Sequence, residues 1–240
     1  MAWTLIAHTQ AGGPGDVTTS AIDTTGADLI VVATVVGGVL GTVSDNKGNS
    51  YALAVDEYDG VLHHGALYYN QTPSVGTGHA ITLTGATVDV VSVQAWSGSI
   101  ASPLDQTNRG QGSSPFPLPS ITPVQDGELL VTVVSGRDSS TTFSIDSGFT
   151  ITDQAPTVPF NNYGGAMAYL VQSAAASIAP AWTDAGGSTL DAAIVSFKAG
   201  PTAALITSDI VSPVVSRAGW HEVRRTALSG RLKPLWIEVF

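Results

Sequence analysis

The sequence Leu29-Ile-Val-Val-Ala-Thr-Val-Val36 is almost continuously apolar and rich in β-branched residues. Such a run is typical of a central β-strand that is buried on both faces. Two further segments, Ala80-Ile-Thr-Leu-Thr84 and Val88-Asp-Val-Val-Ser-Val-Gln-Ala-Trp96, alternate in polarity, which indicates more strands. Glycine-containing turns separate these segments, and no long window within residues 1–200 keeps the apolar period of a helix. The sequence therefore predicts an all-β chain.

The strand pattern occurs twice in the chain. Four blocks recur in the same order at an offset of 100 or 101 residues, and such constant spacing is the signature of an internal duplication. We therefore predict one repeat over about 1–100 and a second over about 101–200. The matching blocks are Ala27-Asp-Leu-Ile-Val-Val32 with Gly127-Glu-Leu-Leu-Val-Thr132, Ser44-Asp-Asn-Lys-Gly48 with Ser144-Ile-Asp-Ser-Gly148, Gly65-Ala-Leu-Tyr-Tyr69 with Gly165-Ala-Met-Ala-Tyr169, and Val91-Ser-Val-Gln-Ala-Trp96 with Ala192-Ala-Ile-Val-Ser-Phe197.

About six strands per repeat, or about twelve in all, fit an antiparallel β-sandwich of the jelly-roll kind. In one arrangement the two repeats are the halves of a single sandwich. In the other they are two tandem immunoglobulin-like sandwiches, linked by the Gly-, Ser- and Pro-rich segment 97–120. We favour the single sandwich, because each half has few large aromatic residues and would build only a thin core alone.

The composition excludes several classes of protein. Nine Lys and Arg against nineteen Asp and Glu give a net charge of −10, which argues against a nucleic-acid partner. The chain has no cysteine, so we expect its cohesion to come from the core and from assembly rather than from covalent or metal staples. The apolar run 29–40 is interrupted and too short for a membrane span, and the N-terminus lacks the pattern of a signal peptide.

The C-terminal tail, residues 201–240, differs from the rest of the chain. It lies outside the repeat and carries a net charge of +2, whereas residues 1–200 carry −12. We expect a short helix over 220–228 and a β-type segment over 235–240. An exposed segment of this composition needs a partner, which is either the sandwich itself or another subunit or protein. The candidate docking residues are Trp220, Arg224, Arg225, Arg231, Trp236, Ile237 and Phe240.

Sequence patterns of catalysis are missing. There is no Gly-x-Ser-x-Gly elbow, no Walker loop and no complete His-Glu-x-x-His motif, so we expect no enzymatic activity, no catalytic residue, no bound metal and no cofactor. The turn Asp45-Asn-Lys-Gly-Asn49 offers oxygen ligands for calcium, but a structural turn is the favoured interpretation. We interpret Asp56-Glu-Tyr-Asp59 as a solvated hairpin turn and the glycine-rich segment 109–114 as a flexible loop.

Aromatic residues are the remaining candidates for ligand binding, because they stack on the faces of sugar rings. Tyr69 and Tyr169 hold matching positions in the two repeats, which favours a place in the core for that pair. The tyrosines considered for sugar stacking are Tyr51, Tyr58, Tyr68, Tyr69 and Tyr163.

Three segments within residues 1–200 carry a resemblance to known proteins. They are Trp3-Thr-Leu-Ile-Ala-His-Thr9, Val17-Thr-Thr-Ser-Ala-Ile-Asp-Thr-Thr-Gly-Ala-Asp-Leu-Ile30 and Val43-Ser-Asp-Asn-Lys-Gly-Asn49. Together they resemble poorly characterised β-sandwich proteins that tailed-phage and bacterial genomes encode. The resemblance implies a virion-associated or surface role and brings no catalytic residues.

From these features we expect a non-catalytic structural protein of a phage virion, made in the host cytoplasm. It would act as capsid decoration or as a fibre or spike component, anchored through its tail. Its expected partners are other virion proteins or further copies of itself in a homo-oligomer, with no nucleic acid and no membrane. The alternative is a carbohydrate-binding module that binds a surface glycan.

Overall fold

The computed structural model describes residues 2–58, 60, 63–85, 88–137, 142–155 and 163–200, together with residues 214–215, 220–223 and 235–238 of the tail. These residues form only strands, turns and irregular segments, and every strand pairing is antiparallel. The all-β class predicted from the sequence is therefore confirmed. None of the described residues belongs to a helix that is long and apolar enough to cross a membrane. The chain divides into two compact units, Met1–Thr202, called the body below, and Ala203–Phe240.

The first half of the body forms two sheets in the strand order of a jelly roll. Strands β1 to β4 alternate between the two sheets, and β5 extends the larger sheet beyond β6. The larger sheet has the order β1 (Thr4–Pro14), β8 (Val88–Ser97), β3 (Leu29–Gly37), β6 (His63–Asn70) and β5 (Ala52–Tyr58), and the smaller has β2 (Val17–Thr18), β7 (Ile81–Thr84) and β4 (Thr42–Asp45).

The second half has the same strand order when β1 to β8 are matched in turn with β9 to β16. This correspondence supports the predicted internal duplication. That the two halves descend from one duplicated segment stays a prediction. Each half has eight strands rather than about six, because β2 and β10 are only two residues long and carry no pattern of their own. The larger sheet has the order β9 (Ser99–Ser113), β16 (Thr189–Ala199), β11 (Glu128–Arg137), β14 (Tyr163–Gln172) and β13 (Thr150–Ala155), and the smaller has β10 (Phe116–Pro117), β15 (Ala181–Asp184) and β12 (Phe143–Ile145).

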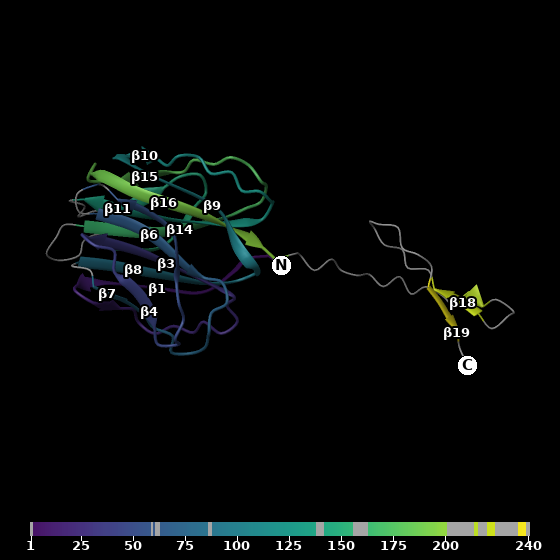
Figure 1. The fold of residues 1–240 in the computed structure, drawn as a ribbon. Coiled ribbons are helices and arrows are strands. Elements are labelled where there is room, and N and C mark those ends of the chain that lie inside the picture. Colours follow the sequence, from purple (N-terminus) through teal and green to yellow (C-terminus); the bar gives the residue numbers. More distant parts are fainter. Residues whose placement is uncertain are drawn as a thin grey trace. The chain divides into compact units, whose positions relative to one another are not determined.

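The body has four layers, because the two larger sheets pack face to face and a smaller sheet covers the outer side of each (Figure 1). This arrangement explains the continuous apolar run of β3. Its alternate residues serve two cores: Val31 and Val35 belong to the central core, and Ile30 and Val32 to the outer core of the first half. Each half is thus a sandwich of its own, and the two sandwiches share the central core, so both arrangements considered from the sequence are combined.

Segment 97–120 is not a linker, the role that the tandem arrangement gave it because of its composition. Most of it forms the edge strand β9, paired along β16. Its glycines leave room for an aromatic ring, since a Cβ added at Gly112 would lie 2.6 Å from Cδ2 of Phe116. The same pairing shows that residues 109–113 belong to a strand and not to a flexible loop.

The tail unit contains a three-stranded antiparallel sheet of β17 (Val214–Val215), β18 (Trp220–Val223) and β19 (Leu235–Glu238). The predicted helix is therefore wrong at Trp220–Val223, because these residues pair with β19 and the tertiary pairing overrides the local helix signals. Residues 224–228 lie outside the described residues. The β-type segment predicted at the C-terminus is confirmed for Leu235–Glu238.

Candidate functional site

The structure describes three of the seven candidate docking residues of the tail. Trp220 begins β18, and Trp236 and Ile237 lie in the middle of β19. In the register of this pair, Trp220 stands opposite Glu238 and Trp236 opposite Glu222. The fold therefore brings both tryptophans onto adjacent strands. Arg224, Arg225, Arg231 and Phe240 lie outside the described residues.

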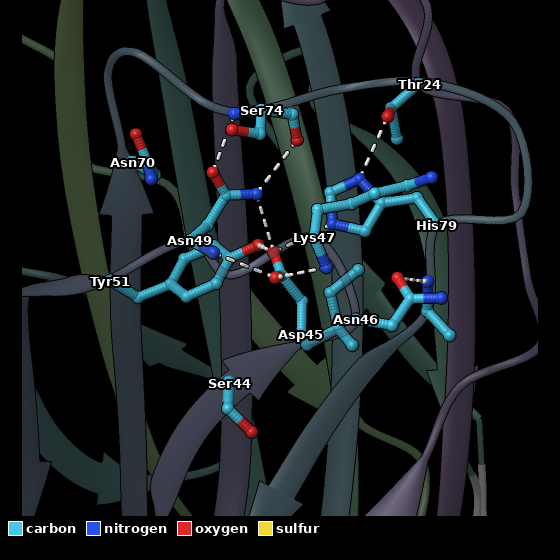
Figure 2. A network of polar contacts seen from close by, with 12 residues as sticks. Thr24, Ser44, Asp45, Asn46, Lys47, Asn49, Tyr51, Asn70, Ser74 and His79 are labelled. Carbon is cyan, nitrogen blue, oxygen red and sulfur yellow. Dashed lines mark hydrogen bonds and ion pairs between the residues drawn. The ribbon is translucent and has the colours of Figure 1, made fainter.

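A dense polar cluster surrounds Asp45 at the end of β4 (Figure 2). Its Oδ1 accepts the backbone N–H groups of Lys47 at 2.9 Å and Asn49 at 3.0 Å. Its Oδ2 accepts Nδ2 of Asn49 at 2.7 Å and the hydroxyl of Tyr51 at 2.7 Å, and lies 2.8 Å from Nε2 of His79. Both carboxylate oxygens are thus surrounded by protein donors.

His79 extends this cluster to a second loop. Its Nδ1 lies 2.9 Å from Oγ1 of Thr24, and that hydroxyl also bonds the backbone of Gly76. A carboxylate, an imidazole and a hydroxyl in this order resemble a nucleophile relay. The side chains of Asp45 and His79 and the whole of Thr24 are nevertheless 0% exposed, so no substrate reaches the hydroxyl. The hydrogen bonds of the cluster connect the turn after β4 to the neighbouring loops.

The electrostatics of Asp45 support the structural interpretation of its turn. Burial alone would raise its pKa, but hydrogen bonds from Tyr51, Asn49 and His79 outweigh burial and lower the pKa to about 2. Burial and this carboxylate together raise the pKa of Tyr51. A calcium ion would have to displace these donors, which already occupy both oxygens of Asp45. Among the described residues, no group of three or more His, Asp or Glu side chains is placed to hold a metal ion.

The second half has apolar residues where this cluster has Asp45 and His79. By the 100-residue offset of the repeat, Ile145 corresponds to Asp45, and Ile178 bridges Ile121 as His79 bridges Ile22. Both isoleucines pack against the outer core of that half. Sequence reasoning singled out Asp45 but missed His79 and Thr24. The available signal was the repeat itself, in which an Asp and a His replace two isoleucines.

A second polar cluster lies where β5 meets β9, and part of it is open to solvent. The ring of Tyr58 stacks on His64, with centroids 4.2 Å apart and planes at 10°, and Nδ1 of His64 lies 2.9 Å from Oδ1 of Asp56. From β9, Nε of Arg109 lies 3.4 Å from Oε2 of Glu57, and its Nη1 donates to the carbonyl of Asp56. Burial raises the pKa of Glu57, and the charge of Arg109 opposes this effect.

This cluster corrects the interpretation of Asp56-Glu-Tyr-Asp59 as a hairpin turn. Residues 56–58 belong to β5 and lie beside β6 and β9, while Asp59 lies outside the described residues. The arrangement places two carboxylates, an imidazole, a guanidinium and a phenol ring together. Tyr58 is 42% exposed and the Arg109 side chain 58% exposed, so this cluster is accessible to a ligand.

The other tyrosines considered for sugar stacking are less accessible. Tyr68 is buried, Tyr51 is bound to Asp45, and Tyr69 and Tyr163 are half-buried. Tyr69 and Tyr169 both pack against the central core, which confirms the role predicted from their matching positions. Tyr58 is therefore the one exposed ring among these candidates.

The body thus holds two polar clusters of different accessibility. The cluster around Asp45 is sealed, and the cluster around Tyr58 is partly open. Comparison with known proteins finds no match for the chain among family models, curated proteins or solved structures.

Proposed function

We propose that the chain is a non-catalytic structural protein of a phage virion, acting as capsid decoration or as a fibre or spike component and anchored through its C-terminal tail. The observation that carries this proposal is the division of the chain into two compact units. The described apolar cores of the body draw on residues from Trp3 to Ala199. The tail forms a unit with a three-stranded sheet of its own, and this unit is the segment that we assign as the anchor.

The use of polar groups in the body supports a structural role. The relay-like cluster of Asp45, His79 and Thr24 is sealed and joins loops rather than presenting a nucleophile. The jelly-roll topology of each half is common in viral capsid proteins and in lectins, and this argument is an analogy of fold.

The first experiment asks where the protein resides. Particles of the phage or prophage that encodes the chain are purified, and their proteins are quantified by mass spectrometry. We expect the chain at a fixed number of copies per particle. Its absence from purified particles, while it is present in the lysate, would refute the virion proposal.

The second experiment tests the anchor. The double substitution Trp236→Ala and Ile237→Ala changes β19 and none of the residues that form the described cores of the body. We expect it to abolish particle binding or self-association of the full-length protein, measured by co-sedimentation and light scattering. The matched control is Val39→Ala with Val124→Ala, two surface residues of the body that are 74% and 60% exposed. Equal binding by both double variants would refute the anchor.

The second candidate function is glycan binding, and the Tyr58 cluster favours it. An exposed ring with carboxylates and an arginine at its side is typical of sugar-binding sites, where stacking and hydrogen bonds act together. The test is a glycan array with the wild-type protein, Tyr58→Ala and the control Tyr163→Ala. A signal that Tyr58→Ala removes and Tyr163→Ala keeps supports this function, and a flat array counts against it.

A further inference from the structure

A lysine, an aspartate and a glutamate converge at one end of the larger sheet of the second half. In this sheet β16 lies between β11 and β9. Lys198 is the penultimate residue of β16, Glu128 is the first residue of β11, and Asp105 lies on β9. Nζ of Lys198 lies 3.3 Å from Oδ1 of Asp105. An amine and a carboxyl group are therefore held in contact by adjacent strands.

Water has little access to two members of this trio. Glu128 is 0% exposed and the Asp105 side chain 4%, whereas the Lys198 side chain is 28% exposed. Oε1 of Glu128 accepts the N–H of Gln125 at 3.2 Å. Oε2 of Glu128 is buried and finds no hydrogen-bond donor within the part of the chain that the structure describes. An ionised Glu128 would leave that oxygen unsatisfied, which is unfavourable in such surroundings.

The surroundings favour the protonated form of Glu128. Burial raises its pKa most strongly, the Ser196 hydroxyl opposes this, and the neighbouring Asp105 raises the pKa further through its charge and through hydrogen bonding. A protonated carboxyl is a hydrogen-bond donor, so the unsatisfied oxygen becomes the group that can donate to Asp105. Leu129 stands opposite Phe197, so Glu128 and Lys198 are neighbours across β11 and β16. Glu128 is thus placed to act as a general acid at the carboxyl group that Lys198 contacts.

We propose that Lys198 and Asp105 condense spontaneously into an intramolecular amide, an isopeptide bond between Nζ of Lys198 and Cγ of Asp105, with Glu128 as the general acid. The ammonium of Lys198 first transfers a proton to the Asp105 carboxylate, which removes two charges from a poorly solvated site. The free amine then attacks Cγ while the Glu128 proton polarises the carbonyl oxygen.

The step is balanced without any further reactant. The new C–N bond forms, the bond from Cγ to its hydroxyl oxygen breaks, and the hydroxyl leaves as water with a proton from the attacking nitrogen. Glu128 relays this proton and ends in its starting state. Fixed proximity favours the step, because groups held in contact react as if at very high concentration, and Nζ of Lys198 already lies 3.3 Å from Oδ1 of the carboxyl group that it would attack. The partial exposure of Lys198 gives the water a way out.

The first half shows that the fold does not require this trio. Asp28 holds the position of Glu128, and its two oxygens accept the N–H groups of Gly98 and Ser99 at 3.0 Å each. Ser97 stands at the position of Lys198, so that half has no amine there. At these two positions the second half therefore differs in side-chain chemistry and not in its strand order.

The proposed bond changes the expectation that a chain without cysteine lacks covalent staples. It would join the edge strand β9 to β16 and close a covalent loop around most of the second half. A cross-link over such a long loop restricts the unfolded chain, as a disulfide does. This inference is independent of the virion proposal, which is tested at Trp236 and Ile237.

The experiment is the intact mass of the folded, full-length protein. We expect a mass lower than that of the sequence by one water molecule. Lys198→Arg and Asp105→Ala should keep their full masses, and Asp105→Asn should lose one ammonia molecule in place of water. Lys47→Arg is the matched control and keeps the loss of water, because Lys47 bonds Thr77 in the other half. Far-UV circular dichroism verifies that each variant is folded.

Tryptic mapping locates the bond. Cleavage after Lys198 should be blocked, and the peptide 48–109 should be found joined to the peptide 138–217. A full mass for the folded wild-type protein would overturn the proposal. So would a loss of water that Lys198→Arg retains, which would indicate a succinimide at Asp105. Glu128→Gln should slow the condensation, and an unchanged rate would overturn the role of Glu128.

Discussion

The ring of Trp96 packs edge-on against that of Tyr169 in the opposite half of the body, with centroids 4.8 Å apart and planes at 71°. Tyr69 and Phe197, which hold the matching positions of the two repeats, make the reciprocal contact at 5.6 Å. An exchange of contacts between equivalent residues is characteristic of two equal halves related by a two-fold axis. The central core is therefore built by both halves together, and neither half completes it alone.

This relationship predicts an energetic coupling between Trp96 and Tyr169. In a double-mutant cycle with Trp96→Leu and Tyr169→Leu, we expect a coupling of about 0.5–1.5 kcal/mol in the free energy of unfolding, measured in urea. The control cycle combines Trp96→Leu with Phe143→Leu, which lies in the outer core of the second half. Its coupling should be close to zero, and a control coupling as large as the first would contradict the prediction.

The glycines of the matching blocks predict a second effect at the same interface. A Cβ added at Gly165 would lie 2.5 Å from Cγ2 of Val35 and 3.1 Å from the carbonyl oxygen of Val134, whereas one added at Gly65 meets nothing closer than 3.4 Å. Gly165→Ala should therefore lower the free energy of unfolding by about 1–3 kcal/mol, as overpacked cores do. Gly65→Ala is the matched control, with a smaller loss expected.

Removal of the clashing methyl group provides a check on this glycine prediction. Combined with Val35→Ala, the change Gly165→Ala should be less destabilising than it is alone, because the nearest atom is gone. Urea unfolding of the wild type, Val35→Ala, Gly165→Ala and the double variant provides the comparison. Equal losses of unfolding free energy for Gly65→Ala and Gly165→Ala would contradict this explanation. They would show that the close approach of the two halves at Val35 does not require a glycine at position 165.

Much of the fold could be predicted from the sequence because its strongest signals are local. The apolar run of β3 predicted a strand buried on both faces, and that strand separates the central core from an outer core. The packing of one larger sheet on the other was not predictable in detail, since it depends on contacts such as that of Gly165 with Val35. The strand β9 was missed because its glycines serve the ring of Phe116, a contact invisible to propensity.

The candidate sites were harder to predict, since their members are distant in the chain. Asp45 was recognised as a turn residue, but its partner His79 is recruited by the pairing of β4 and β7. In the same way, Asp105 and Lys198 meet only because β9 pairs with β16. Single residues of common types carry no local pattern, so only the topology brings them together.

The Asp45 cluster predicts a dependence of stability on pH. The native pKa of Asp45 is about 2, below the unfolded value of about 3.9, so its contribution is present above the unfolded value and is lost as the pH falls toward 2. At neutral pH, Asp45→Asn should lower the free energy of unfolding by about 2 kcal/mol. The difference in unfolding free energy between wild type and Asp45→Asn should become smaller in acid. Urea unfolding at about pH 7, 4 and 2 measures this difference.

One donor to this carboxylate can be removed as a graded control. Tyr51→Phe takes away a hydrogen bond that lowers the pKa of Asp45, so the native pKa should rise toward the unfolded value. The acid-dependent part of the stability should then be smaller than in the wild type and larger than in Asp45→Asn. If the difference in unfolding free energy between wild type and Asp45→Asn stays constant from neutral pH to acid, the pH dependence does not come from the Asp45 carboxylate.

Two buried threonines on corresponding central strands predict opposite responses to the same substitution. Oγ1 of Thr132 accepts the indole N–H of Trp182 at 3.1 Å and donates to the carbonyl of Ala193 at 2.8 Å. Oγ1 of Thr34 is as deeply buried but has no hydrogen-bond partner within the described ranges. Thr132→Val should lower the free energy of unfolding by about 1–3 kcal/mol, because it leaves the buried indole N–H of Trp182 without its hydrogen-bond acceptor. Thr34→Val should leave that free energy unchanged or raise it, since a methyl group replaces an unpaired hydroxyl of the same shape. Equal losses in urea would mean that the hydroxyl of Thr132 stabilises the second half by its volume and not by its hydrogen bonds.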